Sequence, residues 1–145
     1  MAADMGTIQI TTSPRLFIPM NLYLDIFQHC KSEFPYEAVG LLSGLDSTVK
    51  QVWFFQNERK SRTNYYVGIE QIKDVINQIS IQKEELLAIF HSHPTARPLP
   101  SNKDIRHHPK AGGFMVIVSL QNNINIKAFQ VIKESYKEVA IYIIE

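Results

Sequence analysis

Residues 86–94 read LLAIFHSHP, a dense apolar run that ends in two histidines and a proline. The apolar run predicts a buried strand near the centre of a sheet. Alternate residues of a strand point to the same face, so His91 and His93 present their rings side by side while Ser92 points the other way. A rigid central strand that carries two imidazoles is a suitable base for a metal site.

Strands and two long helices are predicted on either side of this run. Apolar residues recur at helical spacing in residues 20–34 and again in residues 69–81, and Pro35 ends the first of these helices. Apolar and β-branched stretches predict strands at residues 15–18, 37–43, 48–56, 65–67, 86–90, 114–120, 125–132 and 139–144, and a short helix is predicted from Ser101 to Pro109. This pattern indicates the α/β (α+β) class, with a mixed β-sheet flanked by helices.

The length indicates a single globular domain. The chain has 145 residues, the size of one domain. We assign the domain to residues 15–145 and interpret the small and polar residues 1–14 as a loose segment. No apolar run approaches the roughly 18 residues that span a membrane, and the N-terminus lacks the pattern of a signal peptide. We therefore expect a cytoplasmic protein without a membrane partner.

Charge and cysteine content narrow the kinds of partner and site. Lys and Arg number 15 and Asp and Glu 14, a net charge of +1, which argues against nucleic acid held mainly by bulk charge. Cys30, the one cysteine, falls on the first predicted helix. A single thiol forms neither a disulfide framework nor a Cys-rich zinc site. Any metal must therefore be bound by His and carboxylate side chains.

Asp104 can complete a metal site with the two histidines. The loop after Pro94 folds back at its prolines, and Asp104 falls in the first turn of the following helix. Two imidazoles and one carboxylate suit zinc, and three protein ligands leave the fourth position for a water. Zinc lowers the pKa of that water to about 7. The sequence predicts one catalytic Zn²⁺ per chain, held by His91, His93 and Asp104.

A hydrolytic site also needs a group that takes a proton from water and passes it to the leaving amine. Glu37 is the candidate, because it opens an apolar strand where partial burial raises the pKa of a carboxylate toward the working pH. Ser101 would lie near the metal, where its hydroxyl can donate a hydrogen bond to the oxyanion that forms when water attacks a carbonyl. Glu37 and Ser101 are therefore the predicted catalytic residues.

Each of these features also has an ordinary structural explanation. His-x-His on a strand often arises by chance, and the glutamate can be a surface residue at a strand start. Ser101-x-x-Asp104 is also typical of a helix N-terminus, although such a cap would hold Asp104 firmly in place. Of the other histidines, His29 is expected to face solvent, and His107 and His108 are expected to be helix C-terminal cations.

Taken together, these residues match a known signature. The pattern is Glu37 in a Glu-x-x-Gly-Leu-Leu setting, followed by His91-x-His93-Pro94-x6-Ser101-x-x-Asp104. It resembles the signature of the JAMM metalloproteases, the MPN+ class of the MPN domain. The resemblance implies a mixed sheet flanked by helices, one zinc held by the two histidines and the aspartate, a general acid/base at Glu37 and an oxyanion helper at Ser101.

The resemblance also implies the kind of substrate. Members of the class cleave peptide or isopeptide bonds at the C-terminus of ubiquitin or ubiquitin-like proteins. The compact chain is similar to minimal bacterial members that act on ubiquitin-like sulfur-carrier proteins. A Gly-Gly tail can enter a narrow groove as an added strand, and we expect the loops at residues 57–64 and after Pro94 to border that groove. The pattern does not set the oligomeric state.

Three other functions compete with a peptidase. The first is a catalytically silent MPN-type scaffold that binds a protein partner. The second is a zinc deaminase acting on a nucleobase, which typically needs a His-x-Glu and a Cys-x-x-Cys that this chain lacks. The third is a DNA-associated role, because another bacterial family shares a similar His-x-His-Pro motif. The near-neutral charge disfavours that third function.

Overall fold

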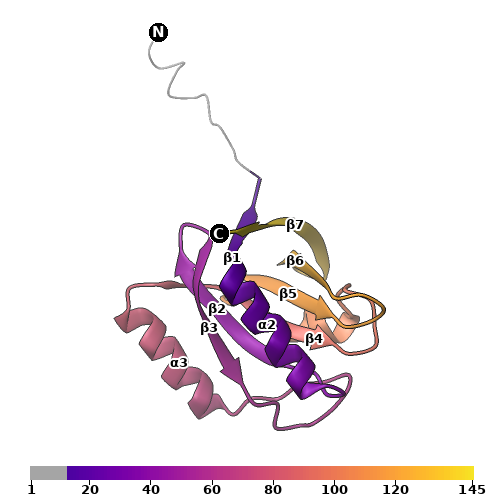
Figure 1. Ribbon diagram of the computed structural model, residues 1–145. Helices are drawn as coiled ribbons and strands as arrows, with labels where there is room; N and C mark the ends of the chain where they lie inside the picture. Colours follow the sequence, from indigo (N-terminus) through magenta and orange to yellow (C-terminus); the bar gives the residue numbers. More distant parts are fainter. Residues whose placement is uncertain (1–12) are drawn as a thin grey trace.

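The computed structural model describes residues 13–145, and within this range seven strands form one sheet that closes into a barrel (Figure 1). The strands are β1 (Arg15–Pro19), β2 (Val39–Leu45), β3 (Thr48–Phe55), β4 (Glu85–His93), β5 (Phe114–Ser119), β6 (Asn125–Ile132) and β7 (Ser135–Ile144). The helices are α2 (Met20–Glu33), α3 (Ile69–Ile81) and α4 (Asn102–His107). The strand order is β1-β3-β2-β4-β5-β6-β7, with the pairs β1–β3, β1–β7 and β4–β5 parallel and the others antiparallel. The prediction of a mixed sheet with helices is confirmed.

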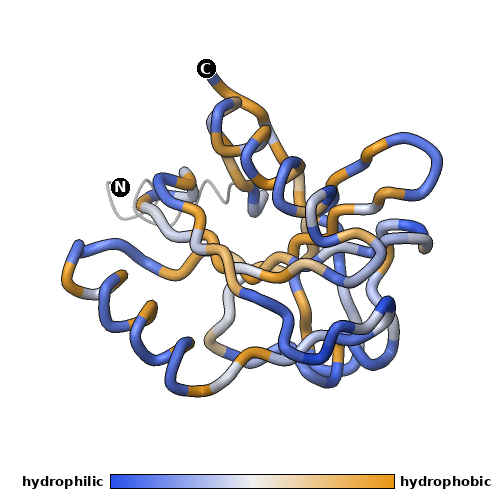
Figure 2. The backbone as a smooth tube through the Cα atoms, turned by 60° about the horizontal axis from the view of Figure 1, so that its bottom comes forward, coloured by the Kyte–Doolittle hydropathy of each residue, from blue (hydrophilic) through white to orange (hydrophobic). Residues whose placement is uncertain are grey.

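The strands β2 and β4 are buried on both faces. Leu42 and Phe90 belong to the apolar cluster that packs against α2, whereas Val39 and Leu41 belong to a second cluster under α3. In Figure 1, α2 crosses in front of the sheet and α3 lies beside β3. In Figure 2, α3 alternates between hydrophobic and hydrophilic positions, as a helix with one buried side does. Burial on both sides explains why both strands are apolar along most of their length.

Gly40 lets β2 lie close to β4. It pairs with Phe90, and a Cβ at this position would overlap the Phe90 ring and the carbonyl oxygen of Trp53. The same register places Val39 opposite His91. The fold therefore brings the start of β2 against the histidine end of β4.

The strand predicted at residues 65–67 is wrong. These residues form no strand, because the Asn57 side chain accepts a hydrogen bond from the Tyr66 N–H and the Tyr66 carbonyl accepts one from the Glu58 N–H. The last strand begins at Ser135 instead of residue 139, because residues 135–139 extend the hairpin with β6. The predicted loose segment falls, for residues 1–12, outside the described residues, and a domain at residues 15–145 stays a prediction.

His29 also differs from the prediction that it faces solvent. Its ring is half-buried against Phe54, with ring centroids 4.6 Å apart. Desolvation by this packing lowers the pKa of His29.

Among the helices of residues 13–145, none is both long and apolar enough to cross a membrane.

Candidate active site

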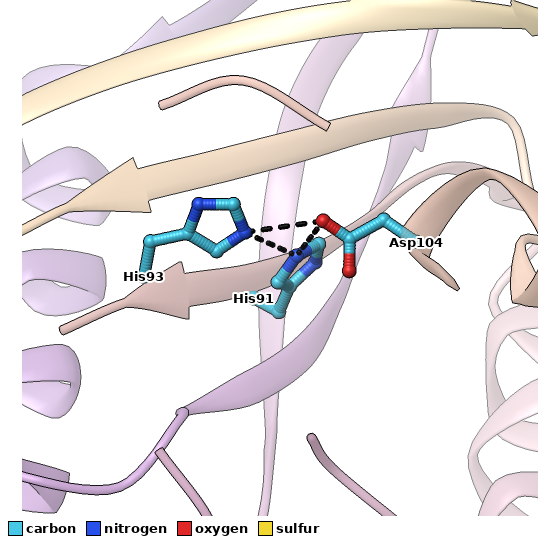
Figure 3. Close-up of side chains that lie close together, drawn as sticks. All are labelled: His91, His93 and Asp104. Carbon is cyan, nitrogen blue, oxygen red and sulfur yellow. Dashed lines mark hydrogen bonds and ion pairs between the residues drawn. The ribbon is translucent and has the colours of Figure 1, made fainter. Parts of the chain in front are cut away.

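The side chains of His91, His93 and Asp104 point toward one another (Figure 3). The two Nε2 atoms are 3.2 Å apart, and the Oδ2 atom of Asp104 lies 3.3 Å from His91 Nε2 and 3.1 Å from His93 Nε2. Zinc in a tetrahedral site lies about 2.0–2.1 Å from its ligands, which places two ligand atoms roughly 3.3 Å apart. The three donor atoms therefore have the spacing of one face of a zinc tetrahedron.

The backbone carbonyl of Arg97 fixes the orientation of His93. His93 Nδ1 donates to this oxygen over 2.8 Å, which leaves Nε2 to face Asp104 Oδ2, 3.1 Å away. Burial lowers the pKa of His91. Burial opposes the charged forms of His93 and Asp104 as well, but their mutual hydrogen bonding raises the pKa of His93 and holds the pKa of Asp104 well below its usual range. The cluster combines an ionised carboxylate with two ring nitrogens, a donor set suited to a divalent cation.

Asp104 is held by a capping box at the start of α4. The Asp104 N–H donates to Ser101 Oγ, and the Ser101 N–H donates to Asp104 Oδ2, both over 3.0 Å. The helix N-terminus expected from Ser101-x-x-Asp104 is therefore present, and it aims the carboxylate at the histidines. The preceding loop is anchored by Ser119, whose hydroxyl donates to the Ala96 carbonyl over 2.6 Å.

Glu37 lies two residues before the start of β2 and is 3% exposed. Its N–H donates to the Ser61 carbonyl over 2.8 Å, and its carbonyl accepts from Asn57 Nδ2 over 3.0 Å. Its Oε1 atom is buried and has no hydrogen-bond partner in the described part of the chain. Burial raises the pKa of Glu37 to about 8, against the opposing effect of His93. A carboxyl with this pKa can both take up and release a proton near neutral pH.

Asn57 is a positioning residue that the sequence did not reveal. It is buried, and its side chain also donates to the Asn64 carbonyl and accepts from the Arg59 and Tyr66 N–H groups. It therefore ties the loop at residues 57–66 to the backbone of Glu37. Nothing in a charged loop after a strand marks one asparagine for this role.

Tyr65 is the second residue that sequence reasoning missed. Its ring packs over the His91 ring, with centroids 5.3 Å apart and planes inclined by 33°. Within residues 13–145, His91 Nδ1 has no hydrogen-bond partner although it is buried, so packing against Tyr65 takes the orienting role that Arg97 has for His93. Burial, with the negative charges of Asp104 and Glu37, raises the pKa of Tyr65 to about 12 and keeps its hydroxyl protonated.

Three cavities share lining residues in this region. One of about 100 Å³ is bordered by Glu37, Tyr65 and Asp104. A second of about 360 Å³ is lined by Glu37, His93, Ser101 and Asp104 and by the loops at residues 62–63 and 94–96. A third, apolar cavity of about 590 Å³ lies under α3 and shares Tyr65 with the first. Four of the five residues singled out in the sequence therefore line these cavities, and His91 lies beside them in the cluster with His93 and Asp104.

The other candidate groups are not part of the three-ligand cluster, although His107 borders a cavity beside it. His107 lines the smallest cavity, and His108 Nε2 is 2.8 Å from the Gly113 carbonyl. Cys30 is buried on the α2 side of the sheet, where desolvation raises the pKa of its thiol to about 12. A buried thiol with this pKa is a poor nucleophile.

Comparison with known proteins identifies the family. Residues 19–132 match the family described as prokaryotic homologs of the JAB domain. The chain belongs to this family. The resemblance to the JAMM/MPN class is thereby confirmed.

Individual relatives are more distant. The JAB-domain chain is 30% identical over 90 residues to a desampylase of Pyrococcus furiosus, covering 62% of this chain and 64% of the relative. It is 29% identical over 91 residues to a probable TtuB-protein conjugate cleaving protease of Thermus thermophilus, covering 63% and 62%. The chain thus spans less than two thirds of either relative. A JAB1/MPN domain protein of Archaeoglobus fulgidus shares the fold, with a TM-score of 0.60 at 21% identity over 90% of this chain and 100% of that protein.

Proposed function

We propose that the JAB-domain chain is a zinc-dependent metallopeptidase of the JAMM type. Its substrate is a ubiquitin-like or sulfur-carrier protein, which it hydrolyses at a peptide or isopeptide bond after the C-terminal Gly-Gly tail. The observation that carries this proposal is the buried carboxyl of Glu37 in the same cavity as Asp104 and beside the histidine pair. The names of the two relatives, a desampylase and a conjugate-cleaving protease, support the substrate class.

The donor spacing supports one zinc per chain, held by His91, His93 and Asp104. Zinc would supply a Lewis acid that polarises the scissile carbonyl and makes water available as hydroxide near neutral pH. The capping box, the Arg97 carbonyl and the Tyr65 ring orient the three ligands. With the ligands fixed in advance, little reorganisation accompanies metal binding.

In this proposal, Glu37 transfers the proton and Ser101 stabilises the oxyanion. Glu37 Oε1, free of hydrogen bonds to the described residues, accepts a proton from the attacking water and returns it to the leaving amine. Ser101 Oγ accepts from the Asp104 N–H, so its own hydroxyl proton is available to the developing oxyanion.

The test combines metal content with cleavage. Zinc is measured by elemental analysis on wild type and on His91→Ala/His93→Ala, and hydrolysis is followed on a ubiquitin-like domain whose Gly-Gly tail carries a peptide extension. We expect about one zinc per chain, lost in the double variant, and cleavage that Glu37→Gln abolishes while zinc is retained. A wild type that neither holds nor takes up zinc would contradict the proposal and favour the silent scaffold.

A cytoplasmic location stays a prediction.

A further inference from the structure

Cations gather in the two segments that border the site. Residues 57–64 and 97–110 hold seven of the 15 cations of the chain but only two of its 14 acids, Glu58 and Asp104. These segments therefore carry a net charge of +5, and because the whole chain carries +1, the remainder carries −4. We name the seven the rim cations: Arg59, Lys60, Arg62, Arg97, Lys103, Arg106 and Lys110.

The rim cations lie around the cavity openings. Arg62 and Lys103 line the cavity of about 360 Å³, which also contains His93 and Asp104. The Arg59 guanidinium lies 6.0 Å from the ring centre of Tyr66, a residue that lines the apolar cavity under α3. Lys110 stands between Pro109 and Ala111, which line the same apolar cavity. Four of the rim cations therefore lie on or next to residues that line the two cavities.

Within residues 13–145, these cations have no ion-pair partner. The ion pairs found in residues 13–145 are those of Asp104 with the two histidines and of Lys127 with Glu138, so no rim cation takes part. Glu58 is used locally, because its Oε2 accepts from the Gly68 N–H over 2.7 Å. Six of the seven side chains are exposed, Lys103 being half-buried. Like charges held close together repel, and an approaching acidic surface relieves that repulsion.

We propose that the rim cations form a docking surface for the acidic face of a ubiquitin-like carrier, a step that rests on the proposed function. Arg59 and Lys110 of this surface lie beside a cavity lined mainly by apolar side chains, including Leu41, Phe55 and Ile76. An apolar centre with a polar rim is the anatomy of a protein–protein interface. Complementary charge accelerates encounter and orients the carrier so that its tail meets the site.

The experiment compares two triple variants that remove the same charge. The rim variant is Arg59→Gln/Lys60→Gln/Lys110→Gln. The control variant replaces Lys50, Lys133 and Lys137 with Gln; all three are exposed. Lys50 lies in β3 near the Gly44–Glu85 pair at the start of β4, and Lys133 and Lys137 lie in the turn and strand that follow β6, so all three are distant from His93 at the end of β4.

Each protein is given two substrates with the same Gly-Gly tail: an acidic ubiquitin-like domain with a peptide extension, and a short fluorogenic peptide without a folded domain. For the rim variant, kcat/KM on the carrier should fall about tenfold at roughly 0.01 M ionic strength, and this deficit should vanish near 1 M salt, where the Debye length is about 3 Å. Peptide cleavage by the rim variant, and both reactions of the control variant, should stay within about twofold of wild type.

Two results would overturn the docking surface. One is an equal loss in the rim and control variants, or a loss on the peptide as large as on the carrier. The other is wild-type binding of a single-stranded oligonucleotide that the rim variant loses while carrier cleavage is unchanged, which would assign the surface to nucleic acid. If no protein cleaves, carrier affinity is measured by calorimetry in the Glu37→Gln background. If the rim substitutions weaken the Kd for the carrier there, docking is supported and only the proposed peptidase activity is refuted. If the Kd is the same with and without the rim substitutions, the docking surface is refuted.

Discussion

Replacing Glu37 with Gln in the metal-free protein should change how the free energy of unfolding depends on pH. Burial raises the pKa of Glu37 from its ordinary value of 4.5 to about 8. Between these values the unfolded chain has released the proton while the folded protein still holds it. The folded state binds more protons, so stability from this group is fully present below pH 4.5 and is lost as the pH rises to about 8.

The size of the effect follows from the two pKa values. Each pH unit between them costs about 1.4 kcal/mol of unfolding free energy. Allowing for partial titration at both ends, wild type should lose roughly 3 kcal/mol from this group between about pH 5 and pH 8. Gln has nearly the same shape and does not titrate, so its variant lacks this loss.

Urea unfolding with a chelator present, at both pH values, measures the difference. The stability of Glu37→Gln relative to wild type should increase by roughly 3 kcal/mol from about pH 5 to pH 8. Glu85→Gln, at an exposed position at the start of β4, is the matched control and should show no such increase. A difference between Glu37→Gln and wild type that does not change with pH would refute the reasoning that burial controls this carboxyl.

Three further substitutions test the residues that support the site. Tyr65→Leu removes the aromatic ring that packs against His91 and should weaken zinc binding about tenfold. Tyr65→Phe keeps the ring and should keep the zinc affinity; chelator competition and the Co²⁺ absorption spectrum measure the effect of each substitution. Asn57→Ala leaves the buried Glu37 carbonyl without its donor and should cost about 1–3 kcal/mol in urea unfolding, with a larger relative loss of kcat than of carrier affinity. Gly40→Ala forces a methyl group against Phe90 and should lower stability by about 1–3 kcal/mol, measured by thermal unfolding; an unchanged Tm would show that β2 can move away from β4.

The parts of the site that follow from local geometry were predictable from the sequence. The alternation of a strand places His91 and His93 on one face, and the structure keeps Ser92 on the other, where its hydroxyl accepts from the Ala38 N–H. The capping box depends only on Ser101 and Asp104, three residues apart. Neither prediction required knowledge of the tertiary structure.

The parts that depend on distant pairing were not predictable in the same way. Glu37 reaches the histidines because Val39 pairs with His91, a register between strands far apart in sequence. Closure of the barrel depends on parallel pairing of β1 with β3 and β7, which no local pattern encodes. Tyr65 was assigned to a strand because its residue type favours one, but the Asn57 side chain supplies the hydrogen bonds that a neighbouring strand would have supplied.

The same contacts that prepare the site make the metal-free fold less stable than it could be. Asp104 Oδ2 and the two Nε2 atoms converge within 3.3 Å, Glu37 is buried as an unpaired acid, and His91 Nδ1 has no partner among residues 13–145. Glu37 Oε1 and His91 Nδ1 would be better solvated in the unfolded chain. A zinc ion that bound the folded arrangement and not the unfolded chain would, at a thousandfold excess over its Kd, add about 4 kcal/mol to the free energy of unfolding. Metal binding would therefore offset the cost of burying His91, whereas Glu37, whose Oε1 has no hydrogen-bond partner within residues 13–145, would remain free to exchange a proton.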